Sequence, residues 1–89
     1  MCETIILDGN RMTERASAHD YLAETLAFPE YYGKNLDALH EVLTESRADV
    51  ELIHCGAMLN ALGKYGCKIL MVFMDSAEEN PHLHFRIAD

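Results

Sequence analysis

The sequence predicts an α/β fold in which a small parallel sheet packs on helices. Two kinds of segment alternate along the chain: those with the β-branched or alternating composition of strands, and those with helical periodicity. Strands separated by helices pair in parallel, because the helix carries the chain back to the end of the sheet at which each strand begins. At 89 residues the chain can bury one modest core. We therefore expect a single domain that spans residues 1–89.

Three segments are predicted to be strands. Residues 4–7 (TIIL) are a largely β-branched run that ends at the turn-forming sequence DGN of residues 8–10. Residues 50–54 (VELIH) form the second strand. Residues 82–87 (HLHFRI) alternate polar with apolar side chains, as a half-buried strand does. Its apolar, inward-facing residues are expected to be Leu83, Phe85 and Ile87.

The first helix is predicted to lie between the first strand and Pro29. Thr13 or Ser17 can cap its N-terminus, because a side-chain oxygen there accepts a hydrogen bond from a free backbone N–H. The helix is expected to end near Leu26, because the residue before a proline is disfavoured in the helical conformation.

Helical periodicity recurs in the rest of the chain. Residues 36–45 are predicted to be a second helix with Asn35 as its N-cap. Its core-facing stripe is Leu36, Leu39, Val42 and Leu43. Residues 57–62 read as a short third helix, whereas residues 68–79 are ambiguous, because they begin with a strand-like composition. One helical face of that segment would nevertheless hold Ile69, Val72, Phe73, Ser76 and Ala77.

The charge of the chain restricts its partners. Seven Lys and Arg against fifteen Asp and Glu give a net charge of −8. Such a surface repels nucleic acid, whose phosphates require a basic face, and it repels anionic membranes. It favours a basic protein partner, although acidity also serves solubility alone. We expect no nucleic-acid partner and no membrane association.

The cysteines and the apolar runs predict a cytoplasmic location. Cys2, Cys55 and Cys67 are an odd number in no CxxC spacing, which indicates reduced thiols. The chain opens without a basic segment, and its longest apolar run, residues 69–74, is too short for a signal peptide or a membrane span.

Tyrosines and acids stand together around the start of the second helix. Tyr31 and Tyr32 lie between Pro29, which fixes one backbone angle, and Gly33, which permits unusual ones. One tyrosine is expected to be buried. The polar residues of the helix fall on one arc of roughly 100°: Asp37, His40, Glu41 and Thr44. A polar arc alone is an ordinary solvated face, but tyrosines on a stiff loop beside it favour a binding patch for a cationic surface.

An enzyme is the first alternative. His40 beside Glu41, with Asp37 one turn earlier, resembles an acid–base pair. Adjacent helical positions lie about 100° apart and do not face each other. No nucleophile or oxyanion donor accompanies them, so we expect no catalysis and no cofactor.

A metal site is the second alternative. His82 and His84 share one face of a predicted strand, and His54 with Cys55 ends another. Such residues can bind zinc, but an exposed alternating edge strand explains the pattern as well. We expect no metal.

The run PEYYGKNLDAL of residues 29–39, followed by an acid after His40 and by Thr44, resembles the barstar family of ribonuclease inhibitors. The resemblance is concentrated in residues 26–44 and continues more weakly back to residues 8–9, with His19 also matching. It implies a three-stranded parallel sheet packed on about four helices. It therefore also implies that residues 68–79 are helical.

The resemblance further implies an activity and its residues. In the family, the loop and second helix block the active site of a small basic secreted ribonuclease and so protect the producing cell. A ribonuclease cleft is cationic, and carboxylates on a rigid helix can imitate phosphates there. The positions that match the family's contact residues in kind are Tyr31, Gly33, Asn35, Leu36, Asp37 and Thr44.

Two positions in the middle of this face differ from the family pattern. His40 replaces a tryptophan, and Glu41 replaces the aspartate that occupies the phosphate site. Asp75 corresponds to a further acidic contact. The partner is therefore either a basic ribonuclease or, alternatively, a different toxin or basic protein that a barstar-like immunity or regulatory module would bind.

Overall fold

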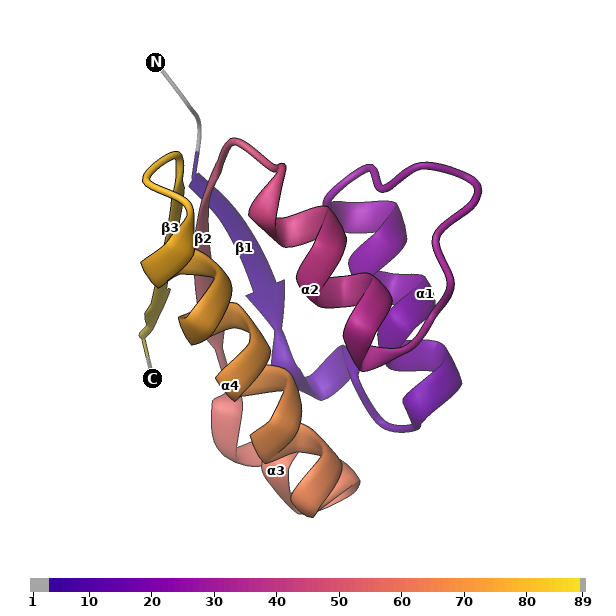
Figure 1. The fold of residues 1–89 in the computed structure, drawn as a ribbon. Helices are drawn as coiled ribbons and strands as arrows, with labels where there is room; N and C mark the ends of the chain where they lie inside the picture. The colour runs from indigo at the N-terminus through magenta and orange to yellow at the C-terminus, as the bar shows by residue number, and fades with distance from the viewer. Residues whose placement is uncertain (1–3, 89) are drawn as a thin grey trace.

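The computed structural model describes residues 4–88 and contains a three-stranded sheet with four α-helices (Figure 1). All strands are parallel, in the order β1-β2-β3. The strands are β1 (Thr4–Asp8), β2 (Ala48–Ile53) and β3 (Leu83–Ile87). The helices are α1 (Arg15–Thr25), α2 (Leu36–Thr44), α3 (Cys55–Leu62) and α4 (Lys64–Glu79), and a 3-10 turn, η1 (Gly9–Arg11), follows β1. The predicted α/β class and parallel sheet are confirmed.

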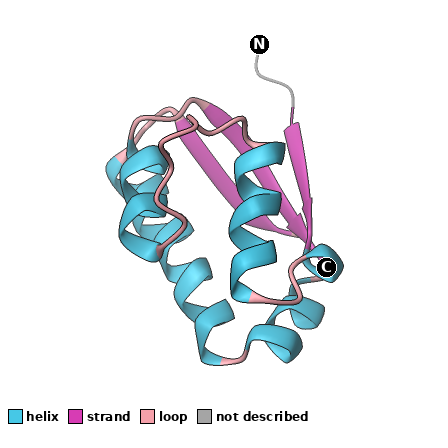
Figure 2. Cartoon of the chain, turned by 90° about the vertical axis from the view of Figure 1, so that its right-hand side faces the viewer, coloured by secondary structure: helices cyan, strands magenta, loops and turns pink. Residues whose placement is uncertain are grey.

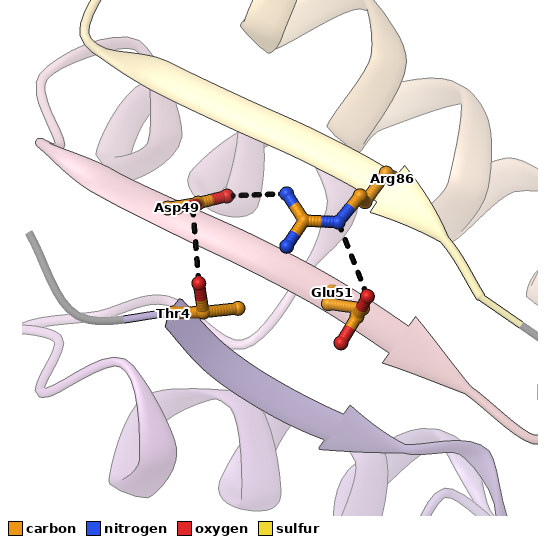
Figure 3. Close-up of polar contacts among 4 residues, drawn as sticks. All are labelled: Thr4, Asp49, Glu51 and Arg86. Carbon is orange, nitrogen blue, oxygen red and sulfur yellow. Dashed lines mark hydrogen bonds and ion pairs between the residues drawn. The ribbon is translucent and has the colours of Figure 1, made fainter.

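The helices cover one face of the sheet (Figures 1 and 2). The strand residues that face them are buried: Leu7, Ala48, Val50, Leu52 and Leu83. The opposite face carries polar side chains, and Figure 3 shows Arg86 between two carboxylates of β2. Its Nη1 lies 2.9 Å from Asp49 and its Nε lies 3.1 Å from Glu51. Thr4 donates a hydrogen bond of 3.1 Å to Asp49. The two faces of the sheet therefore differ in polarity, and the core lies on the helical side.

The ambiguous segment is helical, as the resemblance implied. α4 extends over Lys64–Glu79, and its residues Ile69, Phe73 and Ser76 are buried. The strand-like composition arises because this helix packs its apolar stripe on the sheet, where the Phe73 and Phe85 rings stack at 4.8 Å. α4 begins four residues earlier than the ambiguous segment, and α3 begins at Cys55, two residues earlier than predicted.

Two local predictions were wrong. The N-cap of α1 is Glu14, and Ser17 lies inside the first turn, where its Oγ accepts a 3.1 Å hydrogen bond from the Glu14 N–H. Thr13 lies before the cap. Ile87 is 42% exposed and does not join the core, because it ends an edge strand with a neighbouring strand on one side only. Leu83 is buried and Phe85 is partly buried, as predicted.

The cytoplasmic location was predicted from the cysteines and from the lack of a long apolar segment, and the structure describes both features in part. Cys55 is buried and Cys67 is a free, exposed thiol on α4, so the two do not form a disulfide with each other. Cys2 lies outside the described residues. Within residues 4–88, no helix has the length and apolar composition that crossing a membrane requires.

Candidate functional site

The loop between α1 and α2 follows a backbone path with two left-handed residues. Ala27 and Lys34 have φ values of 55° and 54°. Between them, the Tyr32 N–H donates a 3.0 Å hydrogen bond to the Pro29 carbonyl, which closes a turn. The unusual backbone angles therefore lie at the two ends of the loop, on either side of this turn.

Gly33 does not supply an unusual angle, contrary to the prediction. Among the described glycines, only Gly63 has a positive φ. The space beside position 33 is limited instead. A Cβ there would lie 3.3 Å from the Ala38 Cβ and 3.4 Å from the Asn35 Nδ2. A larger residue would crowd the start of α2.

Asn35 is the N-cap of α2, as predicted. Its Oδ1 accepts a 2.7 Å hydrogen bond from the Ala38 N–H, and its Nδ2 donates to the Gly33 carbonyl at 3.3 Å. The side chain thus joins the loop to the first turn of the helix. The next residue, Leu36, is partly buried and packs against the core. Asn35 and Leu36 therefore set the direction in which α2 leaves the loop.

The two adjacent tyrosines have opposite environments. Tyr32 is 7% exposed, whereas Tyr31 is 83% exposed. The Tyr32 ring lies 4.8 Å from the Phe28 ring, and its hydroxyl lies 2.6 Å from the Nδ1 of His19. The Nε2 of the same histidine lies 2.6 Å from the Tyr65 hydroxyl. Tyr32 therefore anchors the loop on α1 and, through His19, is linked to α4, whereas Tyr31 extends into solvent.

Burial shifts the pKa values of His19 and Tyr32. It lowers the pKa of His19 below its ordinary value; the Asp20 carboxylate acts in the opposite direction and Lys34 acts in the same one. Burial also raises the pKa of the Tyr32 hydroxyl, with Tyr65 acting in the same direction. A neutral imidazole has one donor and one acceptor nitrogen, so one tyrosine hydroxyl accepts and the other donates.

The polar arc of α2 faces outward as predicted. Asp37 and Glu41 are exposed, and His40 and Thr44 are partly exposed. Asp37 lies in the first turn, where a carboxylate is favoured by the helix dipole, but Glu41 lies near the C-terminal end, where it is not. The Thr44 hydroxyl donates to the Glu41 carbonyl at 2.8 Å, so its outward lone pairs remain acceptors.

Tyr31 joins this arc from the loop. An open hollow of about 390 Å³ is lined by Tyr31, Glu41, Val42, Thr44 and Glu45. The structure therefore brings the exposed tyrosine together with the C-terminal half of the arc. We call Tyr31, Asp37, His40, Glu41 and Thr44 the acidic face.

The basic residue of the loop is paired elsewhere. The Lys34 Nζ lies 2.7 Å from the Asp20 Oδ1 on α1. This pair is largely exposed, so it contributes little to stability. It does direct the lysine toward α1, and the negative charges of the acidic face are left without a lysine partner from the loop.

α4 adds carboxylates beside the acidic face. The Nε2 of His40 lies 2.5 Å from the Oε2 of Glu79, and Asp75 is exposed one turn earlier on α4. α2 and α4 pack against each other. The histidine of the supposed acid–base pair is therefore hydrogen-bonded to Glu79, and neither Glu41 nor Asp37 contacts its ring through a hydrogen bond in the described part of the chain.

The histidines that suggested a metal site were also located. His82 and His84 are exposed near the start of β3, and His54 has a left-handed backbone (φ 53°) just after β2. Among residues 4–88, no group of three or more His, Cys, Asp or Glu side chains is placed to hold a metal ion.

Sequence reasoning missed the two residues of α4 that hydrogen-bond His19 and His40. Tyr65 and Glu79 lie 46 and 39 residues from the histidines that they contact. No helical or strand period relates residues so far apart. Only the predicted packing of α4 on the sheet could have suggested that its side chains reach α1 and α2.

The fold and the site define a class: a small α/β protein that presents an acidic, tyrosine-bearing loop and helix to solvent. A family model described as Barstar (barnase inhibitor) matches residues 2–88, so the chain belongs to the barstar family. The chain is also 36% identical over 78 residues to a Bacillus subtilis (strain 168) protein named "Putative ribonuclease inhibitor YrdF". That alignment covers 84% of this chain and 86% of the relative.

Proposed function

We propose that this chain is an intracellular inhibitor that blocks the active site of a small basic ribonuclease of the barnase kind. The observation that carries the proposal is the acidic face itself. Its carboxylates are exposed, and the loop's lysine is paired with Asp20 on α1. A face of this charge complements a cleft lined with arginine and lysine. The family description, a barnase inhibitor, supports the same role.

Rigidity explains how such a face would bind tightly. The Tyr31 ring supplies contact area at low entropic cost, and its loop is already held by Tyr32 and by the Asn35 cap. Glu41 is proposed to occupy the place of a substrate phosphate. The remaining contacts are proposed to come from Gly33, Asn35, Leu36, Asp37, His40, Thr44 and, on α4, Asp75.

The cellular role follows from the same reasoning. A cell that makes a ribonuclease for export needs an inhibitor where its own RNA is found, so we place this protein in the cytoplasm as an immunity protein without catalysis of its own. The free Cys67 thiol agrees with a reducing compartment.

A different toxin is the second candidate partner. The observation that favours it is the chemistry of position 40, where an imidazole held by Glu79 replaces the family's tryptophan. This change lies in the middle of the face and would alter what the partner must present there.

The direct test is inhibition of barnase. Purified protein should suppress RNA cleavage by barnase at a one-to-one ratio and should leave RNA intact when added alone. RNA degradation by the protein itself would overturn the proposal. Full barnase activity at micromolar inhibitor would leave the second candidate as the function to pursue, by co-purification with small basic proteins from the producing cell.

A further inference from the structure

His40 and Glu79 connect the middle of α2, which carries most of the acidic face, to the C-terminal end of α4. The His40 Nε2 and the Glu79 Oε2 are 2.5 Å apart, and the two side chains are 41% and 57% exposed. The contact joins α2 to α4 between residues 39 positions apart in the sequence. It orients a ring that lies in the middle of the face, beside Glu41 and one turn from both Asp37 and Thr44.

The contact determines which ring nitrogen carries the proton. An ionised carboxylate accepts hydrogen bonds and donates none, so the nitrogen that faces Glu79 must be the protonated one. In the neutral ring the other nitrogen, Nδ1, is then an acceptor. Among the described residues, no hydrogen bond to the His40 Nδ1 is formed, so this acceptor is left for a partner.

The neighbours of His40 on the acidic face also present hydrogen-bond acceptors to solvent. Asp37 and Glu41 are exposed carboxylates, and the Thr44 hydroxyl uses its proton on the Glu41 carbonyl. The unpaired side-chain atoms that His40, Asp37, Glu41 and Thr44 present to a partner therefore all accept hydrogen bonds. Only a partner that donates from every facing group, as arginine and lysine do, can satisfy them together.

We propose that Glu79 is a positioning residue that fixes the tautomer of His40, and that His40 is a specificity residue whose Nδ1 accepts a hydrogen bond from a cationic side chain of the partner. This inference rests on the proposed function for its partner, but the tautomer is a property of the free protein. Tryptophan, which the family carries at this position, can only donate. The partner of this chain should thus present an arginine or lysine that donates to His40. The partner of a family member with tryptophan at this position needs no such donor.

The first measurement is the tautomer, by nitrogen NMR of the His40 ring in the free protein at a pH where the ring is neutral. We expect a protonated Nε2 and a bare Nδ1. Glu79→Ala should produce a mixture of tautomers, whereas Glu78→Ala, which removes an equal charge one residue away, should change nothing. A protonated Nδ1, or a wild-type mixture equal to that of Glu79→Ala, would overturn the positioning role.

The second measurement is the affinity for barnase of two substitutions at position 40. His40→Asn keeps an acceptor near the position of Nδ1, whereas His40→Gln reaches toward Glu79 and leaves the Nδ1 position empty. A hydrogen bond to a charged group accounts for at least a tenfold difference, so His40→Asn should bind about ten times more tightly than His40→Gln. Glu79→Ala should bind more weakly than Glu78→Ala.

The outcomes separate the two proposals. Equal affinities of the Asn and Gln variants, or the reverse order, would overturn the specificity role of His40 while wild-type inhibition stands. A wild-type protein without affinity for barnase would instead overturn the proposed function toward this enzyme and the cationic contact with it. The NMR result would then still decide whether Glu79 fixes the tautomer.

Discussion

The Nδ1 atom of His19 on α1 lies 2.6 Å from the hydroxyl oxygen of Tyr32, which immediately follows the exposed Tyr31 of the acidic face. Both residues of this pair are buried. The pair therefore links α1 directly to the loop that contributes Tyr31 to the acidic face. The geometry of the loop therefore depends on the packing of the core. Substitutions that disturb the His19–Tyr32 contact should also change the position of the loop that carries Tyr31.

Removal of the Tyr32 hydroxyl should destabilise the fold. Tyr32→Phe keeps the ring on Phe28 but leaves a buried nitrogen of His19 without its partner, which costs about 1–3 kcal/mol. Tyr31→Phe is the matched control, since its side chain is exposed, and should change the free energy of unfolding by less than about 0.5 kcal/mol. Urea unfolding of both variants measures the difference. Equal unfolding free energies of the two variants would show that the hydrogen bond between Tyr32 and His19 does not stabilise the fold.

Stability should fall as the solution is acidified through the titration of His19. Because burial lowers its pKa in the folded state, the unfolded chain takes up a proton first, at about its ordinary value of 6.5. The contribution of the neutral ring is therefore complete above pH 6.5 and is lost as the pH falls toward the lowered value.

Urea unfolding of wild type and His19→Phe between pH 7.5 and pH 5 measures this effect. The variant has no ring to protonate, so its stability should depend less on pH over this range, even though its unpaired tyrosine hydroxyls make it less stable at every pH. The other histidines are the same in both proteins and therefore do not contribute to the difference between them. Parallel curves for the two proteins would contradict the prediction.

Glu41 should be the main anchor of the proposed interface. A carboxylate desolvated among arginine and lysine costs ~2–5 kcal/mol or more of binding free energy when it is truncated, partly because the partner's cations are left unpaired. Glu41→Ala should act mainly through faster dissociation, whereas Glu45→Ala should mainly change the association rate and its salt dependence. Stopped-flow and surface-binding kinetics with barnase measure both.

Two controls accompany the Glu41 experiment. Unfolding of Glu41→Ala should be unchanged within about 0.5 kcal/mol, because the side chain is exposed and the core stripe of α2 is untouched. Glu41→Asp restores the shorter acid of the family and should bind barnase more tightly than wild type if the extra methylene is a poor fit. Wild-type affinity of Glu41→Ala would mean that another surface makes the contact.

Loss of the Asn35 cap should weaken the start of α2. Asn35→Ala removes the 2.7 Å hydrogen bond to the Ala38 N–H and should cost about 1 kcal/mol of unfolding free energy. Asn60→Ala, an exposed change within α3, should have no such cost, because alanine is the better helix former. If the two variants unfold alike, Asn35 is not a significant cap.

The sequence by itself determined the features that depend on neighbours along the chain. The Asn35 cap, the core stripe of α2 and its acidic arc all follow from residues within two or three turns of one another, and each was confirmed. The order of strands and helices likewise follows from local periodicity and from the helical crossovers that parallel strands require.

Tertiary structure alone decided which polar groups are buried and which partners their hydrogen-bonding atoms find. The sequence predicted that one tyrosine of the pair is core, but only the proximity of His19 and Tyr65 selects Tyr32. Likewise, α4 must pack against α2 before Glu79 can hold His40. Hydrogen bonds between residues tens of positions apart exist only after the helices have docked, and burial, which shifts the pKa of His19, depends on the whole core.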